Sequence, residues 1–170
     1  VPGSPLTYWV PTNIRQLFDM GTVFDADNAG VKRESLWTAK RGMTTGNNAR
    51  FYRFFWENPD TYDQWVPVSK GGEDAWILPR ITRTVWWKAN GEELKRYPGS
   101  YPRNEDYYFQ ESLTWTYIKE GGRRFGILNE NSIFSGEGQS FIPRSDSWTV
   151  LAFSNSHLFT YLMLSLTTGR

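Results

Sequence analysis

Arginine, asparagine and threonine side chains are concentrated in a Gly/Thr/Asn-rich loop and the aromatic run that follows it, at residues 42–56. An arginine fork pairs with O6 and N7 of guanine, and an asparagine amide pairs with N6 and N7 of adenine. A threonine methyl group contacts the methyl group of thymine. These residue types, interleaved with aromatic rings, indicate a surface that could contact nucleic acid.

Charge is distributed unevenly along the chain, although the net charge is only +1. Residues 30–53 carry six basic side chains and one acidic one, and residues 80–103 carry six basic and two acidic ones. Between them, residues 57–74 carry five acidic side chains and Lys70 as the only base. Such a chain can present one cationic face to phosphates, although this alternation also occurs on ordinary protein surfaces. The near-neutral balance excludes an acidic DNA mimic and a protein that binds DNA by bulk charge alone.

No catalytic motif is assembled in the sequence, so no catalytic, cofactor-binding or metal-binding residue is assigned. The nucleophile elbow, the P-loop, the zinc-binding His-Glu-x-x-His and the dinucleotide-binding glycine motif are all missing. The absence of cysteine excludes thiol nucleophiles and iron–sulfur clusters, and the single histidine, His157, is expected to cap or pack the last helix. Two carboxylates would suffice for a glycosidase, but the spacing of the acidic residues pairs none of them, and solvated surface charge is the simpler interpretation. The recurring carboxylates are Glu57, Asp60, Asp63, Glu73, Asp74, Glu92 and Glu93.

The length of 170 residues predicts a single domain covering residues 1–170. Aromatic residues make up 17% of the chain, which can build a large core from few side chains. The mean hydropathy is −0.58, and no apolar run approaches the roughly 18 residues that cross a bilayer, so a soluble protein without a membrane partner is expected. Because the chain begins with valine and no leader follows, we expect a fragment of a longer polypeptide.

The scaffold that positions these residues is predicted to be α+β, a strand-rich mixed sheet domain with short helices near both ends. Thr12 is expected to cap a short helix that ends at Gly21, and a second helix is expected from residue 154 or 155 to 166. Asn90-Gly91 is expected to form a tight turn, because both residues tolerate positive φ. Strands are predicted at residues 50–56, 81–87, 113–118, 124–128, 133–134, 141–142 and 148–153. The tryptophans interpreted as core residues are Trp56, Trp86, Trp115 and Trp148.

An ordered set of short motifs resembles the target recognition domains of adenine-specific DNA methyltransferases. Residues 42–51 match the Gly-x-x-Thr-Gly-x-Asn-x-x-Phe segment that opens many such domains. Further matches follow in order at residues 53–57, 65–67, 70–72, 85–87, 90–91, 102–109 and 113–115, and the linker-like residues 2–9 and the C-terminal helix also fit. The resemblance covers nearly the whole chain and is closest to BREX phage-defence methyltransferases and their Eco57I-like restriction–modification relatives. One departure is Glu111-Ser112-Leu113, where the family has a glycine after the acidic residue.

The resemblance implies a target-recognition-domain-like fold and sequence-specific recognition of double-stranded DNA. It also implies that the N6-adenine methyl transfer, with its cofactor S-adenosylmethionine, belongs to the methyltransferase catalytic domain of the same parent chain, in the bacterial cytoplasm. Neither the cofactor glycine motif nor the Asn-Pro-Pro-aromatic motif of that domain occurs here, so the chain by itself is expected to be non-catalytic. This division is physically reasonable, because a methyltransferase must rotate its adenine out of the duplex while other contacts hold the DNA.

The residues expected at the DNA are those that combine suitable chemistry with a place in these motifs. Lys70, followed by two glycines, could clamp a phosphate or could lie at a solvated hairpin tip. The candidate DNA-binding residues are Thr44, Thr45, Asn47, Asn48, Arg50, Arg53, Lys70, Arg80, Arg83, Arg103, Asn104 and Thr114.

Two other functions remain open from the sequence. Aromatic residues and many carboxylates also suit a carbohydrate-binding or glycan-active β domain, and a protein-interaction domain would bury its aromatic residues in the core. Salt distinguishes these possibilities, because rising salt weakens DNA binding steeply through counterion release, whereas stacking on sugars responds little.

The first prediction concerns the two arginines of the loop and strand. We expect Arg50→Ala or Arg53→Ala to lower the affinity for duplex DNA without unfolding the domain, because each removes a cation and a base-pairing fork. Fluorescence anisotropy with labelled duplex measures the affinity, and circular dichroism checks the fold. Normal duplex binding by both variants would contradict the assignment.

Overall fold

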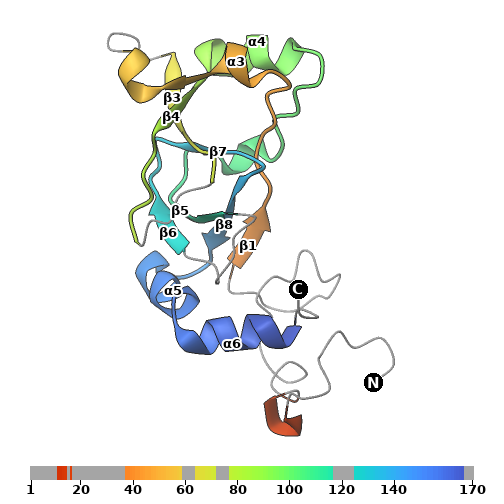
Figure 1. The fold of residues 1–170 in the computed structure, drawn as a ribbon, viewed down its shortest axis with the longest axis vertical. Coiled ribbons are helices and arrows are strands. Elements are labelled where there is room, and N and C mark those ends of the chain that lie inside the picture. Colours follow the sequence, from red (N-terminus) through yellow and green to blue (C-terminus); the bar gives the residue numbers. More distant parts are fainter. Residues whose placement is uncertain are drawn as a thin grey trace.

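The computed structural model describes residues 11–14, 16, 37–58, 64–71, 77–116 and 125–166. Within these residues two four-stranded sheets and several short helices form an α+β fold, as the sequence pattern predicts. Figure 1 shows the arrangement: one sheet lies with helices α3 and α4 in the upper half, the second sheet lies below it, and helices α5 and α6 lie at the bottom. We call these the upper sheet and the lower sheet.

The upper sheet has the strand order β2-β4-β3-β7. Its central strand β4 pairs antiparallel with β2 and β3, and β7 pairs parallel with β3. Val85 of β4 lies opposite Tyr52 on one side and Val66 on the other, and it is fully buried. The strands are β2 (Tyr52–Phe54), β3 (Trp65–Ser69), β4 (Arg83–Trp86) and β7 (Ile133–Phe134). The helices beside this sheet are α3 (Asn48–Phe51), η1 (Phe55–Glu57), α4 (Lys88–Arg96) and η2 (Glu105–Tyr107).

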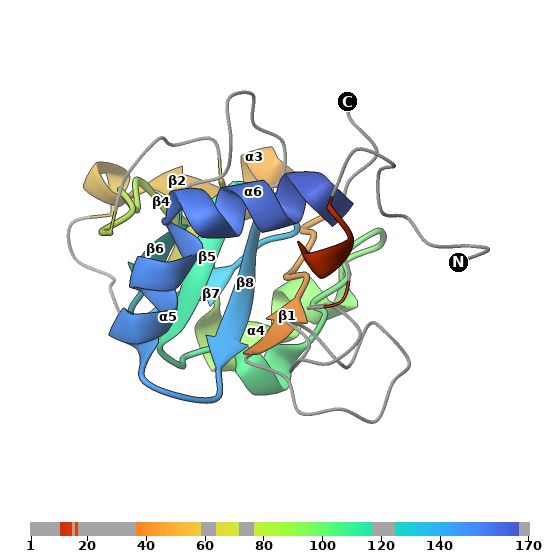
Figure 2. The same cartoon turned by 90° about the horizontal axis from the view of Figure 1, so that it is seen from below.

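The lower sheet has the order β1-β8-β5-β6, and all of its neighbouring strands are antiparallel. Seen from below, α6 lies across this sheet with α5 beside it (Figure 2). Phe159 of α6 packs edge-on against Trp37 and Phe125, and Trp37 stacks on Phe141, so that the four rings form one core. The strands are β1 (Trp37–Lys40), β5 (Ser112–Thr116), β6 (Phe125–Leu128) and β8 (Gly138–Pro143), and the helices are α5 (Ser147–Ser154) and α6 (His157–Leu166).

The two sheets meet where β3 ends and β8 begins. The buried hydroxyls of Ser69 and Thr114 share a hydrogen bond of 2.8 Å that joins β3 to β5. Gly138 is required at this junction, because a Cβ there would lie 2.6 Å from both the Ser69 Oγ and the Gly71 nitrogen. We call this contact the sheet junction.

Residues 50–56 do not form the single predicted strand. They are divided among α3, β2 and η1. Asn47 begins α3, because its side-chain oxygen accepts a hydrogen bond from the Arg50 N–H at 3.1 Å. Glu57 holds η1, because its carboxylate accepts from the Phe54 N–H at 2.6 Å. The caps divide a segment that aromatic content alone assigned to one strand.

Residues 148–153 form helix α5, so the prediction of a last strand there was wrong. Asp146 caps the helix by accepting the Thr149 N–H at 2.7 Å, and this hydrogen bond holds the pKa of Asp146 below its ordinary value of 3.8. Val150, Leu151 and Ser154 are buried, a helical spacing that the alternation of a strand cannot produce. The overlooked signal was the capping aspartate.

The other predicted elements are largely confirmed, with bounds that differ by a few residues: β8, for example, covers Gly138–Pro143 where residues 141–142 were predicted. β4, β5, β6, β7 and β8 fall within or beside the predicted strands, and α6 begins at His157 with Ser156 Oγ accepting the Phe159 N–H at 3.1 Å. Asn90 and Gly91 have left-handed backbone angles, φ 57° and 72°, at the start of α4. Trp86 and Trp115 pack against the two cores, whereas Trp56 and Trp148 are 58% and 57% exposed, so their assignment to the core was wrong.

Some predictions lie outside the described residues. Residues 12–14 and 16 are helical, but the rest of the helix expected to end at Gly21 is not described. The same holds for the linker-like residues 2–9, for Gly72 and for Asp60, Asp63, Glu73 and Asp74. Among the residues that are described, no helix is both long and apolar enough to cross a membrane.

The sheet junction provides a test of the fold. We expect Gly138→Ala to lower the free energy of unfolding by about 1–3 kcal/mol, because the added methyl group overlaps backbone atoms that cannot move independently. Gly136→Ala is the control: its Cβ would lie 3.1 Å from the Nε of the flexible Arg41 side chain, so its loss should be much smaller. Urea unfolding measures both, and equal losses would show that the junction is not tightly packed.

Candidate nucleic-acid interface

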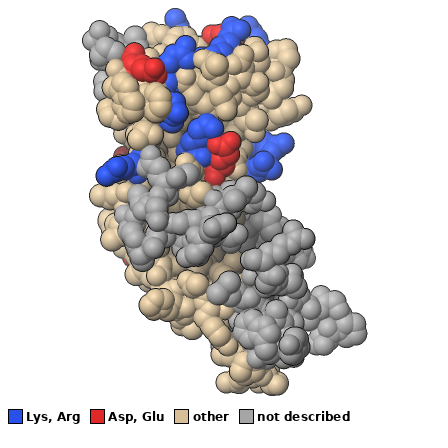
Figure 3. Space-filling view, in the orientation of Figure 1, with Lys and Arg blue, Asp and Glu red and all other residues tan. Residues whose placement is uncertain are grey.

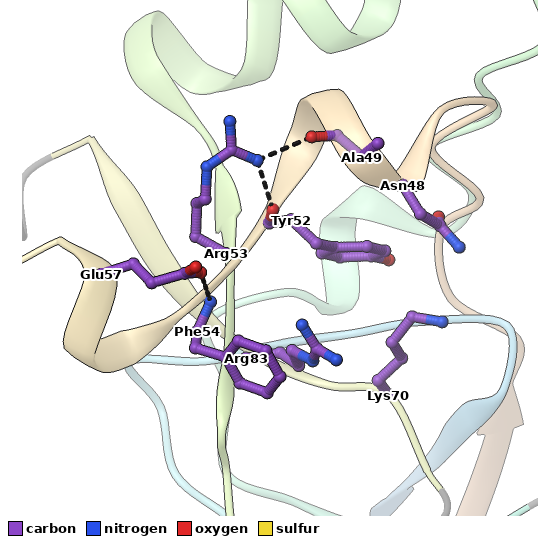
Figure 4. Close-up of a pocket in the computed structure, with 8 residues that line it drawn as sticks. All are labelled: Asn48, Ala49, Tyr52, Arg53, Phe54, Glu57, Lys70 and Arg83. Carbon is purple, nitrogen blue, oxygen red and sulfur yellow. Dashed lines mark hydrogen bonds between the residues drawn. The ribbon is translucent and has the colours of Figure 1, made fainter.

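A pocket of about 450 Å³ lies beside the upper sheet and collects three cationic side chains. Arg53 comes from β2, Arg83 from β4, and Lys70 follows the end of β3 (Figure 4). Together with Asn48 they make four of the predicted DNA-binding residues, which come from three separate segments of the chain. We call this the basic pocket; its lining residues are Asn48, Ala49, Tyr52, Arg53, Phe54, Glu57, Lys70 and Arg83.

Arg83 is held by an aromatic ring. Its guanidinium carbon lies 3.4 Å from the centre of the Phe54 ring, close enough for a cation–π contact. Within the described residues no carboxylate forms an ion pair with Arg83. Stacking uses the face of the guanidinium and leaves its N–H edge able to donate to an oxygen ligand.

Arg53 binds the main chain that surrounds it. One guanidinium nitrogen, Nη1, donates to the carbonyl oxygens of Ala49 and Tyr52 at 2.7 Å each, and the group lies 5.5 Å from the Trp65 ring centre. These bonds connect α3 to β2. Arg53→Ala would therefore remove main-chain support as well as a charge, and its thermal stability must be compared with its affinity.

Lys70 is brought to the pocket by the pairing of β3 with β4, which sets Val68 opposite Arg83, and its ammonium group is already paired. Its Nζ lies 2.7 Å from the Glu137 carboxylate and 5.3 Å from the centre of the Tyr52 ring. Burial, followed by the negative charge of Glu137, raises the pKa of Tyr52 well above its ordinary value of 10.0, so the phenol stays neutral. A phosphate at Lys70 would compete with Glu137, which is an exposed partner.

Arg50 lies outside the basic pocket, in a neighbouring network on α3 and α4. Its guanidinium donates to Glu93, at 2.6 Å from Nη2, and Glu93 also accepts the Trp86 indole N–H at 2.9 Å. The hydrogen bond from Arg50 and then the one from Trp86 hold the pKa of Glu93 below its ordinary value of 4.5. Asn47, which caps α3, donates to the Tyr97 hydroxyl at 3.1 Å, so both of its polar ends have partners inside the protein.

A third group consists of two adjacent loops, at residues 41–46 and 100–104. The backbone of Thr44 pairs with that of Tyr101 through hydrogen bonds of 3.0 and 2.8 Å. The Asn104 amide donates to the Arg41 carbonyl at 2.8 Å, and the Arg103 guanidinium lies 5.7 Å from the Tyr101 ring centre. The side chains of Thr44, Arg103 and Asn104 are exposed there. Arg80 is also exposed, on the segment that precedes β4.

Two of the predicted contacts are buried and serve the fold. Thr45 is 1% exposed and donates to the Asn48 side chain at 2.6 Å. Thr114 is 4% exposed and belongs to the sheet junction. Their hydroxyls are occupied within the protein, so we remove both from the candidate interface. At these two positions the motifs at residues 42–51 and 113–115 contribute to packing within the fold.

The cations share one region of the surface. In Figure 3, Lys and Arg gather on the upper half of the face shown, over the upper sheet and its helices, with acidic groups beside some of them. The sequence analysis missed Arg41, which lies beside Asn104, and the exposed aromatic side chains of η1. Charge could have indicated Arg41, but the exposure of Phe55 and Trp56 depends on a turn that the aromatic pattern concealed. Among the described residues no cluster of His, Asp or Glu could hold a metal ion.

Comparison with known proteins places the chain near one enzyme class. No family model matches it. Over 92% of its length it is 26% identical to the adenine-specific methyltransferase PglX of Lacticaseibacillus casei (strain Zhang), and over 95% it is 25% identical to the adenine-specific methyltransferase BrxX of Escherichia coli O9:H4 (strain HS). The chain spans only 14% and 13% of the length of these relatives. It is thus similar to one region of BREX-type adenine-specific methyltransferases, in agreement with that part of the sequence resemblance.

The Arg50–Glu93 network predicts a pH dependence. Because the pKa of Glu93 is lower in the folded chain than in the unfolded chain, its contribution is present at neutral pH and is lost as the pH falls through the folded pKa. We expect Glu93→Gln to lower the melting temperature slightly at neutral pH, since both groups are exposed, and the difference from the wild type to vanish in acid. Circular dichroism melts across this range measure it.

The control is Glu92→Gln, which removes the same charge from the same helix but breaks the pair with Arg96 instead. A Glu93→Gln effect that stays constant from neutral to acid pH would contradict the assigned network.

Proposed function

We propose that the chain is the target recognition domain of an N6-adenine DNA methyltransferase of a BREX phage-defence or restriction–modification system, and that it reads a specific sequence in double-stranded DNA. The observation that carries the proposal is the basic pocket, which collects Arg53, Lys70 and Arg83 on a chain similar to adenine-specific methyltransferases. Residues 1–170 act as one domain in this proposal, as a part of a longer parent chain.

Phosphate binding is the role that best fits the basic pocket. A duplex presents phosphate oxygens to cationic side chains, and each neutralised phosphate releases counterions. Arg83 is suited to this role because Phe54 holds its guanidinium and no described carboxylate neutralises it. Lys70 would exchange its ion pair with the exposed Glu137 carboxylate for an ion pair with a phosphate. These contacts position the duplex but carry no sequence information.

Base recognition is assigned to the exposed side chains of the two adjacent loops. Arg103 offers a fork suited to guanine, Asn104 an amide suited to adenine, and Thr44 a methyl group suited to thymine. Tyr101 backs Arg103 and pairs with Thr44, so the three side chains are presented by a connected pair of loops. The Asn104 amide donates one of its two hydrogens to the Arg41 carbonyl, which leaves the second hydrogen and the oxygen for an adenine edge.

Methyl transfer is assigned to the remainder of the parent chain. The sequence contains neither a cofactor glycine motif nor an Asn-Pro-Pro-aromatic motif, so S-adenosylmethionine and the flipped adenine would be bound by the catalytic domain. The partners of this chain are then double-stranded DNA and that catalytic domain, in the bacterial cytoplasm. The chain would choose the place where the adenine is rotated out of the helix.

The salt dependence of binding tests this proposal. We expect the chain to bind a fluorescein-labelled duplex pool with a randomised centre, with an affinity that falls steeply as salt rises. Lys70→Gln and Arg83→Gln should each reduce the slope of log K against log salt by about 0.9, because each removes one phosphate contact. Fluorescence anisotropy across a salt series gives the slopes, and sequencing of the bound fraction shows whether one sequence is selected.

The matched control is Arg144→Gln, which removes an exposed cation at the end of β8 in the lower sheet and should leave the slope unchanged. An affinity for duplex that does not fall as salt rises, or binding to glycans in place of duplex, would contradict the proposal and favour a carbohydrate-binding domain. Absence of any duplex binding by the folded chain would also contradict it.

A further inference from the structure

The turn η1 presents two aromatic side chains to solvent next to the basic pocket. Phe55 is 46% exposed and Trp56 is 58% exposed, whereas most tryptophans in proteins are well covered. The turn is the orange coil at the upper left of Figure 1, at the opposite end of the molecule from α5 and α6. Phe54, which precedes the turn, and Glu57, the last residue of the turn, line the basic pocket (Figure 4). The exposed rings therefore lie within one residue of the pocket wall.

Trp56 is the outer layer of a stack. Its ring lies parallel to the Phe54 ring, with 4.4 Å between centroids and 12° between planes. The Arg83 guanidinium lies 3.4 Å from the Phe54 centroid, and it must occupy the opposite face, since the Trp56 ring would collide with it on the same face. The order is thus guanidinium, phenyl ring, indole. The Arg83 guanidinium of the basic pocket and the exposed Trp56 indole therefore lie on opposite faces of the same Phe54 ring.

The turn is held rigidly for so exposed a segment. Glu57 accepts the Phe54 N–H at 2.6 Å, and the Phe55 N–H donates to the Thr82 carbonyl at 3.1 Å. The Asn58 amide donates to the Thr84 hydroxyl on β4 at 3.1 Å. Fixing an aromatic surface in advance lowers the entropy lost when a ligand stacks on it. An exposed indole with this support has the properties of a binding surface.

We propose that Trp56, which stacks on Phe54 and contacts the Phe55 ring edge to face at 5.0 Å between centroids, stacks on a nucleobase of the DNA that the basic pocket holds by its phosphates. This inference rests on the proposed function and adds a contact to a base face, which phosphate and base-edge contacts do not supply. Any base offers a π face, so the contact is tolerant of sequence. A duplex base exposes its face only when a step opens, at a cost of a few kcal/mol that a bulged base does not require. Trp56 therefore favours DNA with an unstacked base.

The test compares two probes, a fluorescein-labelled duplex pool and the same pool with one central unpaired nucleotide. We expect the wild-type chain to bind the bulged pool more tightly. Trp56→Leu, which keeps apolar bulk without a π face, should weaken binding to the bulged pool by about fivefold or more and abolish the preference. Trp56→Phe, which has a smaller π face, should keep much of the wild-type preference for the bulged pool. The salt slope should stay unchanged in both variants, because no phosphate contact is removed.

The matched control is Trp148→Leu, which removes an equally exposed tryptophan from α5 at the far end of the molecule and should bind both pools like the wild type. Phe55→Leu provides a second variant of the same turn, with a smaller loss of preference expected. If Trp56→Leu binds both pools as the wild type does, the stacking role is overturned while salt-dependent DNA binding stands. If the wild type binds neither pool, the proposed function fails and the stacking role fails with it.

Discussion

The backbone of Gly138 passes so close to Ser69 and Gly71 that the two sheets can join only where a residue has no side chain. The buried hydroxyl pair of Ser69 and Thr114 lies at the same place, so the junction satisfies its own polar groups. Lys70 follows Ser69 directly, and Glu137 precedes Gly138, which places their ion pair at the outer edge of the junction. The pairing of β2, β4 and β3 within the upper sheet sets Arg53, Arg83 and Lys70 close together, and the sheet junction adds Glu137 as the partner of Lys70 at the edge of the basic pocket.

Aromatic rings hold the cations of the upper half in place. A chain with a net charge of +1 cannot attract an anion by bulk charge, so the arrangement of its cations decides what it can bind. A ring holds a guanidinium or ammonium group without neutralising it. Arg50 and Lys70 also have a carboxylate partner, Glu93 and Glu137 respectively, whereas no described carboxylate forms an ion pair with Arg53, Arg83 or Arg103. The 17% aromatic content thus supplies two cores and a set of supports for cations. The pairs are Lys40 with Tyr107, Arg50 with Phe51 and Tyr97, Arg53 with Trp65, Lys70 with Tyr52, Arg83 with Phe54, Lys95 with Trp87, and Arg103 with Tyr101.

The two errors in the assignment of secondary structure have one physical origin. Aromatic and β-branched residues were assigned to strands at 50–56 and 148–153, although capping side chains at Asn47 and Asp146 begin helices there. The cap residues were visible in the sequence, but propensity averaged over a window outweighed them. Trp56 and Trp148 were assigned to the core for the same reason, since a strand would have buried one face. Both errors concern a segment where a local hydrogen bond overrides average preference.

The sequence by itself determined the α+β class, the positions of β4 to β8, the left-handed turn at Asn90-Gly91 and the chemical types of the candidate interface. These depend on local periodicity, turn chemistry and residue type, which a linear pattern records. Only the tertiary structure decided which candidates meet. It grouped Arg53, Lys70 and Arg83 in the basic pocket. It placed Arg50 outside that pocket, in an ion pair with Glu93, and it buried Thr45 and Thr114. Such groupings depend on pairing between strands that are distant in the sequence, and the spacing of residues along a chain does not contain that information.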